Sequence, residues 1–249
     1  LFWAFDARHR RAARAGIGLA FGSTLSPREA DRLVLASMRH FARLTFESLA
    51  MPAYAASATP DTPAGHVTVE GFEHAREAMA KGRGVVGFSG HFGNWELLTH
   101  TFGHLGIPPA LVARPMDNPL VEARIERVRS QTGDRVLGKR GVLQEALRIL
   151  RGGGLVALLI DHHPRNGGVP VPFFGRQVMV RDTLARLALR TGAAVLPGNA
   201  CLLPDGTWRV TVEPEVPVAR TDDIRSDCQD IMARCTDILE RWIRENPEQ

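Results

Sequence analysis

His91 and Glu96 are the residues whose types and spacing most clearly suggest chemistry, and both lie in the stretch Gly-His-Phe-Gly-Asn-Trp-Glu. A carboxylate beside an imidazole can hold the ring in one tautomer and make it more basic. The opposite ring nitrogen can then take a proton from a hydroxyl as a general base. Gly90 and Gly93 flank the histidine and let a ligand approach the backbone closely. We interpret His91 and Glu96 as a candidate catalytic pair, and this interpretation depends on the elements around them.

A strand and a helix are predicted on either side of His91. Residues 84–88 form an apolar run of strand length. Asn94 is a typical helix N-cap residue, and residues 95–104 can follow it as one helix, with Glu96 in the first turn. His91 therefore lies beyond the carboxyl end of a strand, which is where α/β sheets usually place functional groups.

Two further polar side chains follow strand-like runs. Residues 109–113 end at Arg114, and residues 155–160 end at Asp161. The second run has no polar alternation, so both of its faces should be buried, as in a central parallel strand. If these strands are parallel neighbours, then Arg114, Asp161 and His91 meet at one edge of the sheet.

The rest of the chain alternates between strand-like and helix-like segments. Further strands are predicted at 67–70, 169–175, 194–200 and 208–212, and further helices at 27–49, 72–81, 119–133, 142–150, 181–190 and 221–245. This alternation predicts an α/β fold with a mostly parallel central sheet flanked by helices. We expect a single domain over 1–249, with an N-terminal helical region at 1–50 and an α/β core at 66–249.

The predicted helix after Pro119 carries an apolar side between Val121 and Val128. Arg129 flanks this inward side, whereas Arg127 points outward. A guanidinium group near a cleft can bind phosphate through two parallel hydrogen bonds. Arg129 is therefore a candidate for binding an anionic group, and snorkelling over apolar surface is the alternative.

Composition indicates an ordinary globular protein, and its arginine-rich, basic balance has two explanations, a GC-rich genome or an anionic partner. The chain has 249 residues and a net charge of +4, and nearly all of its basic residues are arginine. A phospholipid surface, a phosphorylated glycolipid or an acidic carrier protein would each fit this charge. Residues 1–21 mix aromatic and arginine side chains, which suits either a membrane interface or a helix packed on its own domain.

The ends of the chain and its cysteines bear on location. No apolar run approaches the ~20 residues that span a bilayer. The first residue is Leu1 and not Met, so we expect a preceding segment, which could carry an anchor. Three cysteines without metal or disulfide spacing suit a reducing, cytoplasmic setting.

Four blocks of sequence carry a resemblance to a known family. They are His91 to Glu96, then Arg114-Pro115-x-x-Asn118-Pro119 continuing to Arg129-x-x-x-Gly133, then Asp161-His162, and finally Val169-x-Val171-Pro172-Phe173-Phe174-Gly175. In this order they resemble the bacterial lipid A (lauroyl/myristoyl) acyltransferase family of the lysophospholipid acyltransferase superfamily, a branch that includes mannolipid acyltransferases. The resemblance covers roughly residues 71–249, and it implies that the family's usual sequence continues beyond both ends.

The resemblance implies a glycerolipid acyltransferase-like fold and an O-acyltransferase of the His-x4-Glu type. An acyl chain would pass from acyl carrier protein or coenzyme A to a hydroxyl of a lipid A precursor or related membrane glycolipid. No metal or other cofactor and no nucleic acid would take part, and the enzyme would lie on the cytoplasmic face of the inner membrane. The implied catalytic residues are His91 and Glu96, and the implied substrate-binding residues are Asn94, Arg114, Asn118, Arg129 and Asp161.

The developing oxyanion of such a reaction needs hydrogen-bond donors. The backbone N–H groups of Gly93 and Asn94 are the expected ones. Two departures from the family pattern are also present. His162 stands where many members carry Gln, and the segment 177–180 is bulkier and more apolar than usual. That segment borders the expected acyl site, so acyl length and acceptor type stay open.

Two alternatives compete with this interpretation. The run Ile-Asp-His-His-Pro at 160–164 resembles the metal-binding motif of DHH phosphoesterases, in which Asp and His at a strand end hold two metals. That family also needs a pair of aspartates on its first strand, and the strand at 84–88 leads instead into Ser-Gly-His. A non-catalytic protein that binds anionic lipid is the second alternative.

Overall fold

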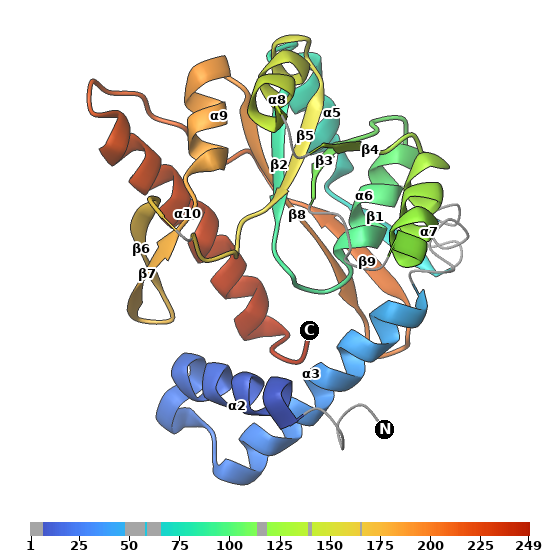
Figure 1. Ribbon diagram of the computed structural model, residues 1–249, viewed down its shortest axis with the longest axis vertical. Helices are drawn as coiled ribbons and strands as arrows, with labels where there is room; N and C mark the ends of the chain where they lie inside the picture. The colour runs from blue at the N-terminus through green and yellow to red at the C-terminus, as the bar shows by residue number, and fades with distance from the viewer. Residues whose placement is uncertain (1–6, 48–57, 59–65, 114–118, 139–140, 165) are drawn as a thin grey trace.

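A seven-stranded sheet with helices on both faces forms the body of the protein, and two N-terminal helices extend from one end of it (Figure 1). The computed structural model describes residues 7–47, 58, 66–113, 119–138, 141–164 and 166–249. The sheet contains, in spatial order, β1 (Val67–Glu70), β9 (Trp208–Val212), β8 (Ala194–Leu202), β2 (Val85–Ser89), β5 (Leu155–Leu159), β3 (Ala110–Val112) and β4 (Arg135–Leu137).

Strand directions confirm the predicted, mostly parallel sheet. β8, β2, β5, β3 and β4 are all parallel to one another. The exceptions are β9, which pairs antiparallel with β8, and β1, which runs parallel to β9. A separate antiparallel hairpin is formed by β6 (Val169–Phe173) and β7 (Arg176–Val180).

Helices cover both faces of the sheet. Their bounds are α2 (Ala7–Phe21), a 3-10 turn η1 (Gly22–Thr24), α3 (Pro27–Glu47), α5 (Phe72–Ala80), α6 (Trp95–His104), α7 (Pro119–Ser130), α8 (Val142–Arg151), α9 (Thr183–Thr191) and α10 (Ile224–Glu245). Val86 and Phe88 of β2 pack with residues of α8, α9 and α10, and Val85 packs on the opposite side with α5 and α6. Because both faces are covered, the central strands are mostly apolar, and β5 is apolar along its whole length, as predicted for residues 155–160.

The register of β2 and β5 sets the position of the site. These parallel neighbours pair Ser89 with Leu159, and the N–H of Ile160 donates to the carbonyl of Ser89 at 3.0 Å. His91 and Asp161 each lie two residues beyond the end of their strand. They therefore emerge side by side at the carboxyl edge of the sheet.

Most predicted elements are present, and two strands were missed. β4 and β7 lie in segments for which no strand was predicted. Phe174 and Gly175 form the turn of the β6–β7 hairpin with positive φ values of 49° and 70°, so the extended segment predicted at 169–175 is β6 followed by this turn.

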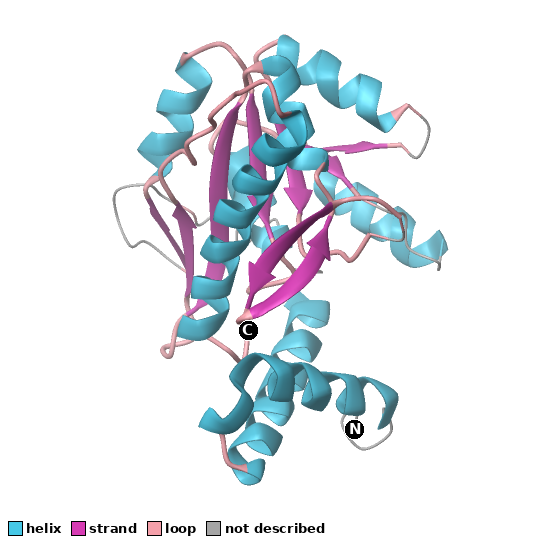
Figure 2. Ribbon diagram, turned by 90° about the vertical axis from the view of Figure 1, so that its left-hand side faces the viewer, coloured by secondary structure: helices cyan, strands magenta, loops and turns pink. Residues whose placement is uncertain are grey.

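The N-terminal helices α2 and α3 lie beyond the carboxyl edge of the sheet, next to the C-terminal end of the chain, in both views (Figures 1 and 2). α3 contacts the turn that follows β2, because Nε2 of His40 lies 3.3 Å from the carbonyl oxygen of Gly93. At the tip of the hairpin, Phe21 of α2 meets Phe174 with ring centroids 5.5 Å apart. None of the helices in the described ranges is both long enough and apolar enough to span a bilayer.

Candidate active site

The imidazole of His91 is held by Asp161. Oδ1 of Asp161 lies 2.9 Å from Nδ1 of His91, and Oδ2 accepts a hydrogen bond from the backbone N–H of His91 at 2.7 Å. Burial alone would raise the pKa of Asp161, but the hydrogen bonds and charge of His91 outweigh it and hold this pKa below its ordinary value. An ionised carboxylate only accepts hydrogen bonds, so Nδ1 carries the proton. Nε2 is then the nitrogen that can act as a base.

Two aromatic rings also contact the imidazole of His91. Trp95, the first residue of α6, meets it edge-on with ring centroids 5.1 Å apart. His162 meets it edge-on at 4.7 Å. The side chain of His91 is nevertheless 42% exposed, so a substrate can reach it while its orientation is fixed.

The backbone of the 91–94 turn is packed tightly against β8. Gly93 has φ +58°, and a Cβ atom there would lie 1.9 Å from the carbonyl oxygen of Ala200, so only glycine fits this position. The N–H of Asn94 donates to that same oxygen at 2.8 Å, and the N–H of Gly93 donates to the carbonyl of Gln249 at 3.2 Å. The expectation that these two N–H groups stabilise an oxyanion is therefore wrong, because both already have acceptors in the protein.

Asn94 is the N-cap of α6, as predicted. Its Oδ1 accepts a hydrogen bond from the N–H of Leu97 at 3.0 Å, and the residue is only 3% exposed. This geometry gives the amide oxygen a capping role. A contact between Asn94 and substrate stays a prediction.

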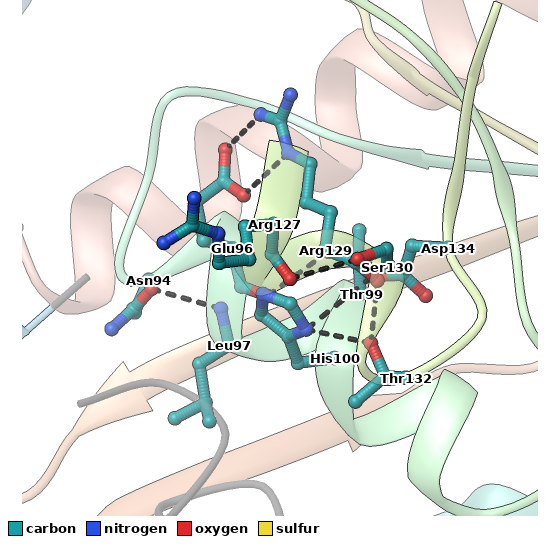
Figure 3. Close-up of polar contacts among 10 residues, drawn as sticks. All are labelled: Asn94, Glu96, Leu97, Thr99, His100, Arg127, Arg129, Ser130, Thr132 and Asp134. Atoms are coloured by element: carbon teal, nitrogen blue, oxygen red, sulfur yellow. Dashed lines mark hydrogen bonds and ion pairs between the residues drawn. The ribbon is translucent and has the colours of Figure 1, made fainter. Parts of the chain in front are cut away.

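Glu96 binds Arg129 and not His91, so the predicted hydrogen bond between Glu96 and His91 is wrong. The guanidinium of Arg129 donates from Nε to Oε2 at 3.1 Å and from Nη2 to Oε1 at 2.5 Å (Figure 3). The strand register brings Asp161 to the level of His91, whereas Glu96 lies one residue into α6 and faces α7. The predicted inward position of Arg129 is confirmed, since its side chain is 12% exposed and Arg127 is exposed.

A second, more deeply buried polar cluster lies beside the Glu96–Arg129 pair (Figure 3). Nδ1 of His100 is 2.8 Å from Oγ1 of Thr132 and 3.5 Å from Oδ2 of Asp134. The side chains of His100 and Asp134 are 1% and 0% exposed. Burial lowers the pKa of His100 to about 4 and raises the pKa of Asp134 to about 7, because both groups lose the hydration that stabilises their charged forms. No sequence pattern predicted this cluster.

A small cavity of about 220 Å³ opens beside Asp161. Its polar lining consists of Asp161, His162, His163 and Thr236, and its apolar lining consists of Ile160, Phe173, Val178, Met179, Val180 and Leu239. The apolar residues come largely from the β6–β7 hairpin and α10, so the segment predicted to border the acyl site does line a cavity next to His91.

The remaining predicted site residues, Arg114 and Asn118, lie outside the described residues. Ligand atoms of His91, Asp161 and His162 lie within 4.8 Å of one another. Two histidines and a carboxylate are a donor set that transition metals accept. This is the same Asp-His segment that suggested the metal-dependent alternative.

Comparison with known proteins identifies one family. The family profile described as bacterial lipid A biosynthesis acyltransferase matches residues 1–249. A phosphatidylinositol mannoside acyltransferase of Mycolicibacterium smegmatis is 28% identical over 200 residues, covering 77% of this chain and 63% of that protein. A lipid A biosynthesis lauroyltransferase of Escherichia coli is 29% identical over 185 residues, covering 73% of this chain and 58% of that protein.

The alignments therefore span between half and two-thirds of the length of these curated relatives. Among solved structures, the 1-acyl-sn-glycerophosphate acyltransferase PlsC of Thermotoga maritima aligns with a TM-score of 0.43 and 16% identity, covering 97% of this chain and 98% of that one.

Proposed function

Because the chain belongs to the bacterial lipid A biosynthesis acyltransferase family, we propose that it transfers a fatty acyl chain from a thioester to a hydroxyl of a membrane glycolipid. The observation that carries this proposal is the His91–Asp161 pair beside a partly apolar cavity. A thioester has a good leaving group, but a sugar or acyl-chain hydroxyl is not ionised at neutral pH. The reaction therefore needs a base that activates the hydroxyl.

In the proposed mechanism, Nε2 of His91 takes the proton of the acceptor hydroxyl as its oxygen attacks the thioester carbonyl. The new C–O bond forms, the C–S bond breaks, and the departing thiolate receives the proton back from His91. The carboxylate of Asp161 stabilises the imidazolium that forms between these steps, through its 2.9 Å contact with Nδ1. General-base catalysis of this kind contributes ~10²–10⁴-fold to the rate.

Glu96 has a different part in this proposal from the one that the sequence suggested. Its carboxylate neutralises and orients the guanidinium of Arg129 at the junction of α6 and α7. Two parallel hydrogen bonds hold the planar group in one direction. Arg129 is still proposed to bind an anionic group of the substrate, together with Arg114 and Asn118. Glu96 is proposed to position Arg129.

The cavity beside Asp161 is the proposed position for the start of the acyl chain. Phe173, Val178 and Leu239 give it apolar walls, and Asp161 lies at its polar side. A chain held there would present its thioester carbonyl close to His91. Acyl carrier protein and coenzyme A are the two proposed donors, and a lipid A precursor or a mannosylated phosphatidylinositol lipid is the proposed acceptor class, in line with the relatives.

We also propose that the protein works on the cytoplasmic face of the inner membrane. Support comes from the lipid substrates of the family and from the surface of the N-terminal helices. Arg8 and Arg11 of α2 are exposed, and Phe41 and Phe46 of α3 are 60% and 75% exposed. Exposed arginines on one helix and exposed large apolar side chains on the helix packed against it suit an anionic lipid surface.

The direct test is an acyl-transfer assay. The protein is incubated with acyl carrier protein thioesters or acyl-coenzyme A and a total lipid extract, and lipids are analysed by mass spectrometry. The expected result is a glycolipid whose mass increases by one acyl group, with no such product from the His91→Ala protein. Release of free fatty acid without an acylated lipid would indicate a thioesterase and contradict the proposal.

A further inference from the structure

We propose that the imidazole of His162 donates a hydrogen bond to the thioester carbonyl oxygen as that oxygen becomes negatively charged. This inference rests on the proposed acyl transfer and adds a residue that contacts the reacting atoms. No proton is transferred in this step, because the N–H of His162 stabilises the oxyanion and keeps its hydrogen. When the C–S bond breaks, the carbonyl re-forms and the hydrogen bond weakens.

The need for such a donor follows from the backbone of the active-site turn. The N–H of Asn94 is 2.8 Å from the carbonyl of Ala200, and the N–H of Gly93 donates to Gln249. The first contact is short and is locked by the packing of Gly93 against Ala200. Releasing either N–H toward a substrate would break a hydrogen bond of the folded protein. A side-chain donor avoids that rearrangement.

The position of His162 fits this role. Its ring centroid lies 4.7 Å from that of His91, and ligand-capable atoms of His91, Asp161 and His162 lie within 4.8 Å of one another. A carbonyl that reacts with a hydroxyl held by His91 must lie ~3 Å from the attacking oxygen and ~3 Å from its oxyanion donor. Two imidazoles at this separation can serve the two oxygen atoms at the same time.

The surroundings of His162 support the same assignment. It lines the cavity together with the apolar residues Phe173 and Leu239 and is itself exposed. A thioester whose chain occupies the cavity therefore has its carbonyl near this ring. The imidazole N–H of His162 and the amide N–H of a glutamine side chain are both hydrogen-bond donors of similar reach.

Two substitutions separate hydrogen bonding from aromatic packing. His162→Gln retains an N–H donor but loses the ring that packs on His91, and His162→Phe retains a ring but has no donor. If His162 stabilises the oxyanion, His162→Phe should lower kcat by ~10²-fold with little change in the KM for the donor thioester, because removing one oxyanion donor typically costs that much. His162→Gln should stay within about tenfold of the parent protein.

The opposite order, with Phe active and Gln impaired, would overturn the proposal and assign His162 to packing alone. Equal activity of both variants and the parent would also overturn it. Circular dichroism and thermal unfolding of each variant show whether a loss reflects folding. If the parent protein transfers acyl groups and His91→Ala does not, these outcomes concern His162 only, whereas an inactive parent protein would count against the proposed function itself.

Discussion

Asp161 receives two hydrogen bonds from His91, one from the backbone N–H at 2.7 Å and one from the ring at 2.9 Å. The first fixes where the residue sits, and the second fixes which nitrogen of its ring carries the proton. Both follow from the register of β2 and β5, which ends the two strands at the same level. The acid that supports the proposed base thus comes from a neighbouring strand and not from the helix that follows His91.

The first prediction concerns the pair itself. His91→Ala removes the proposed base, so the acyl-transfer rate at saturating donor should fall by ~10²-fold or more. Asp161→Asn keeps the shape but loses the charge that stabilises an imidazolium, so a substantial but smaller loss is expected. Circular dichroism serves as the folding control. A folded His91→Ala protein with near-normal turnover would disprove the mechanism.

The second prediction concerns Glu96 and Arg129. Arg129→Ala should strongly reduce transfer, whereas Arg127→Ala, a matched exposed arginine on the same helix, should have little effect. Since Glu96 acts through Arg129 in this account, Glu96→Gln should reduce transfer as well, and the double variant should be no worse than Arg129→Ala alone. Such non-additivity is the signature of contacting residues. Fully additive losses would show that Glu96 has a separate role, such as a direct contact with His91.

The third prediction concerns stability and the buried His100–Asp134 cluster. The pKa of His100 falls from its ordinary 6.5 to about 4, so this residue contributes stability above pH 6.5 that is lost as the pH falls toward 4. The pKa of Asp134 rises from 3.8 to about 7, so its contribution is present below pH 3.8 and is lost as the pH rises toward 7. Between about pH 4 and 6.5 the two residues change the free energy of unfolding in opposite directions, so their contributions to its pH dependence should cancel.

Replacing one of the two residues should therefore reveal how the other changes the free energy of unfolding with pH. Relative to the parent protein, the free energy of unfolding of Asp134→Asn should decrease by up to about 1.4 kcal/mol per pH unit as the pH falls from 6.5 to 4. Relative to the parent protein, the free energy of unfolding of His100→Asn should decrease as the pH rises over the same interval. Urea unfolding at several pH values measures both. If neither variant differs in slope from the parent protein, the two groups do not titrate as the buried environment implies.

The fourth prediction distinguishes the acyltransferase from the metal-dependent alternative. Elemental analysis of the purified protein should find no stoichiometric Mn, Mg or Zn, and chelators should leave acyl transfer intact. Two tightly held metals near Asp161 and His162, together with phosphodiesterase activity, would instead favour the DHH-type interpretation.

The fifth prediction concerns membrane binding. The protein should bind vesicles that contain anionic phospholipid, and binding should weaken as salt increases. Replacing Arg8 and Arg11 of α2 with Gln should reduce binding. Replacing Arg225, in the first turn of α10, and Arg220, four residues before that helix, should not, because both arginines are exposed and this end of α10 lies far from α2 (Figure 1). Absence of binding even at low salt would refute this role for the N-terminal helices. Trp3 and Phe5, two of the aromatic residues in the stretch 1–21, lie outside the described residues.

Sequence alone was enough for features that depend on local patterns. The apolar run of β2, the Asn94 cap and the strand end before Asp161 were all predicted because propensity and burial decide them within a few residues. The partner of His91 could not be predicted this way, since Glu96 and Asp161 are both plausible acids and only the strand register separates them. The His100–Asp134 contact similarly depends on how the turn after α7 packs on α6. β7 was missed because its exposed, mixed residues lack a strand period.

The contacts of the 91–94 turn also bear on how the protein folds. His91 is hydrogen-bonded to Asp161, 70 positions later in the chain, and Gly93 contacts His40, Ala200 and Gln249. Contacts this distant in sequence form slowly, because long loops must close before parallel strands can pair. The base and its acid should therefore come together only in the last stage of folding. Partly folded chains would contain local structure such as α6 without a competent His91, and recovery of activity after refolding would lag behind recovery of helical structure.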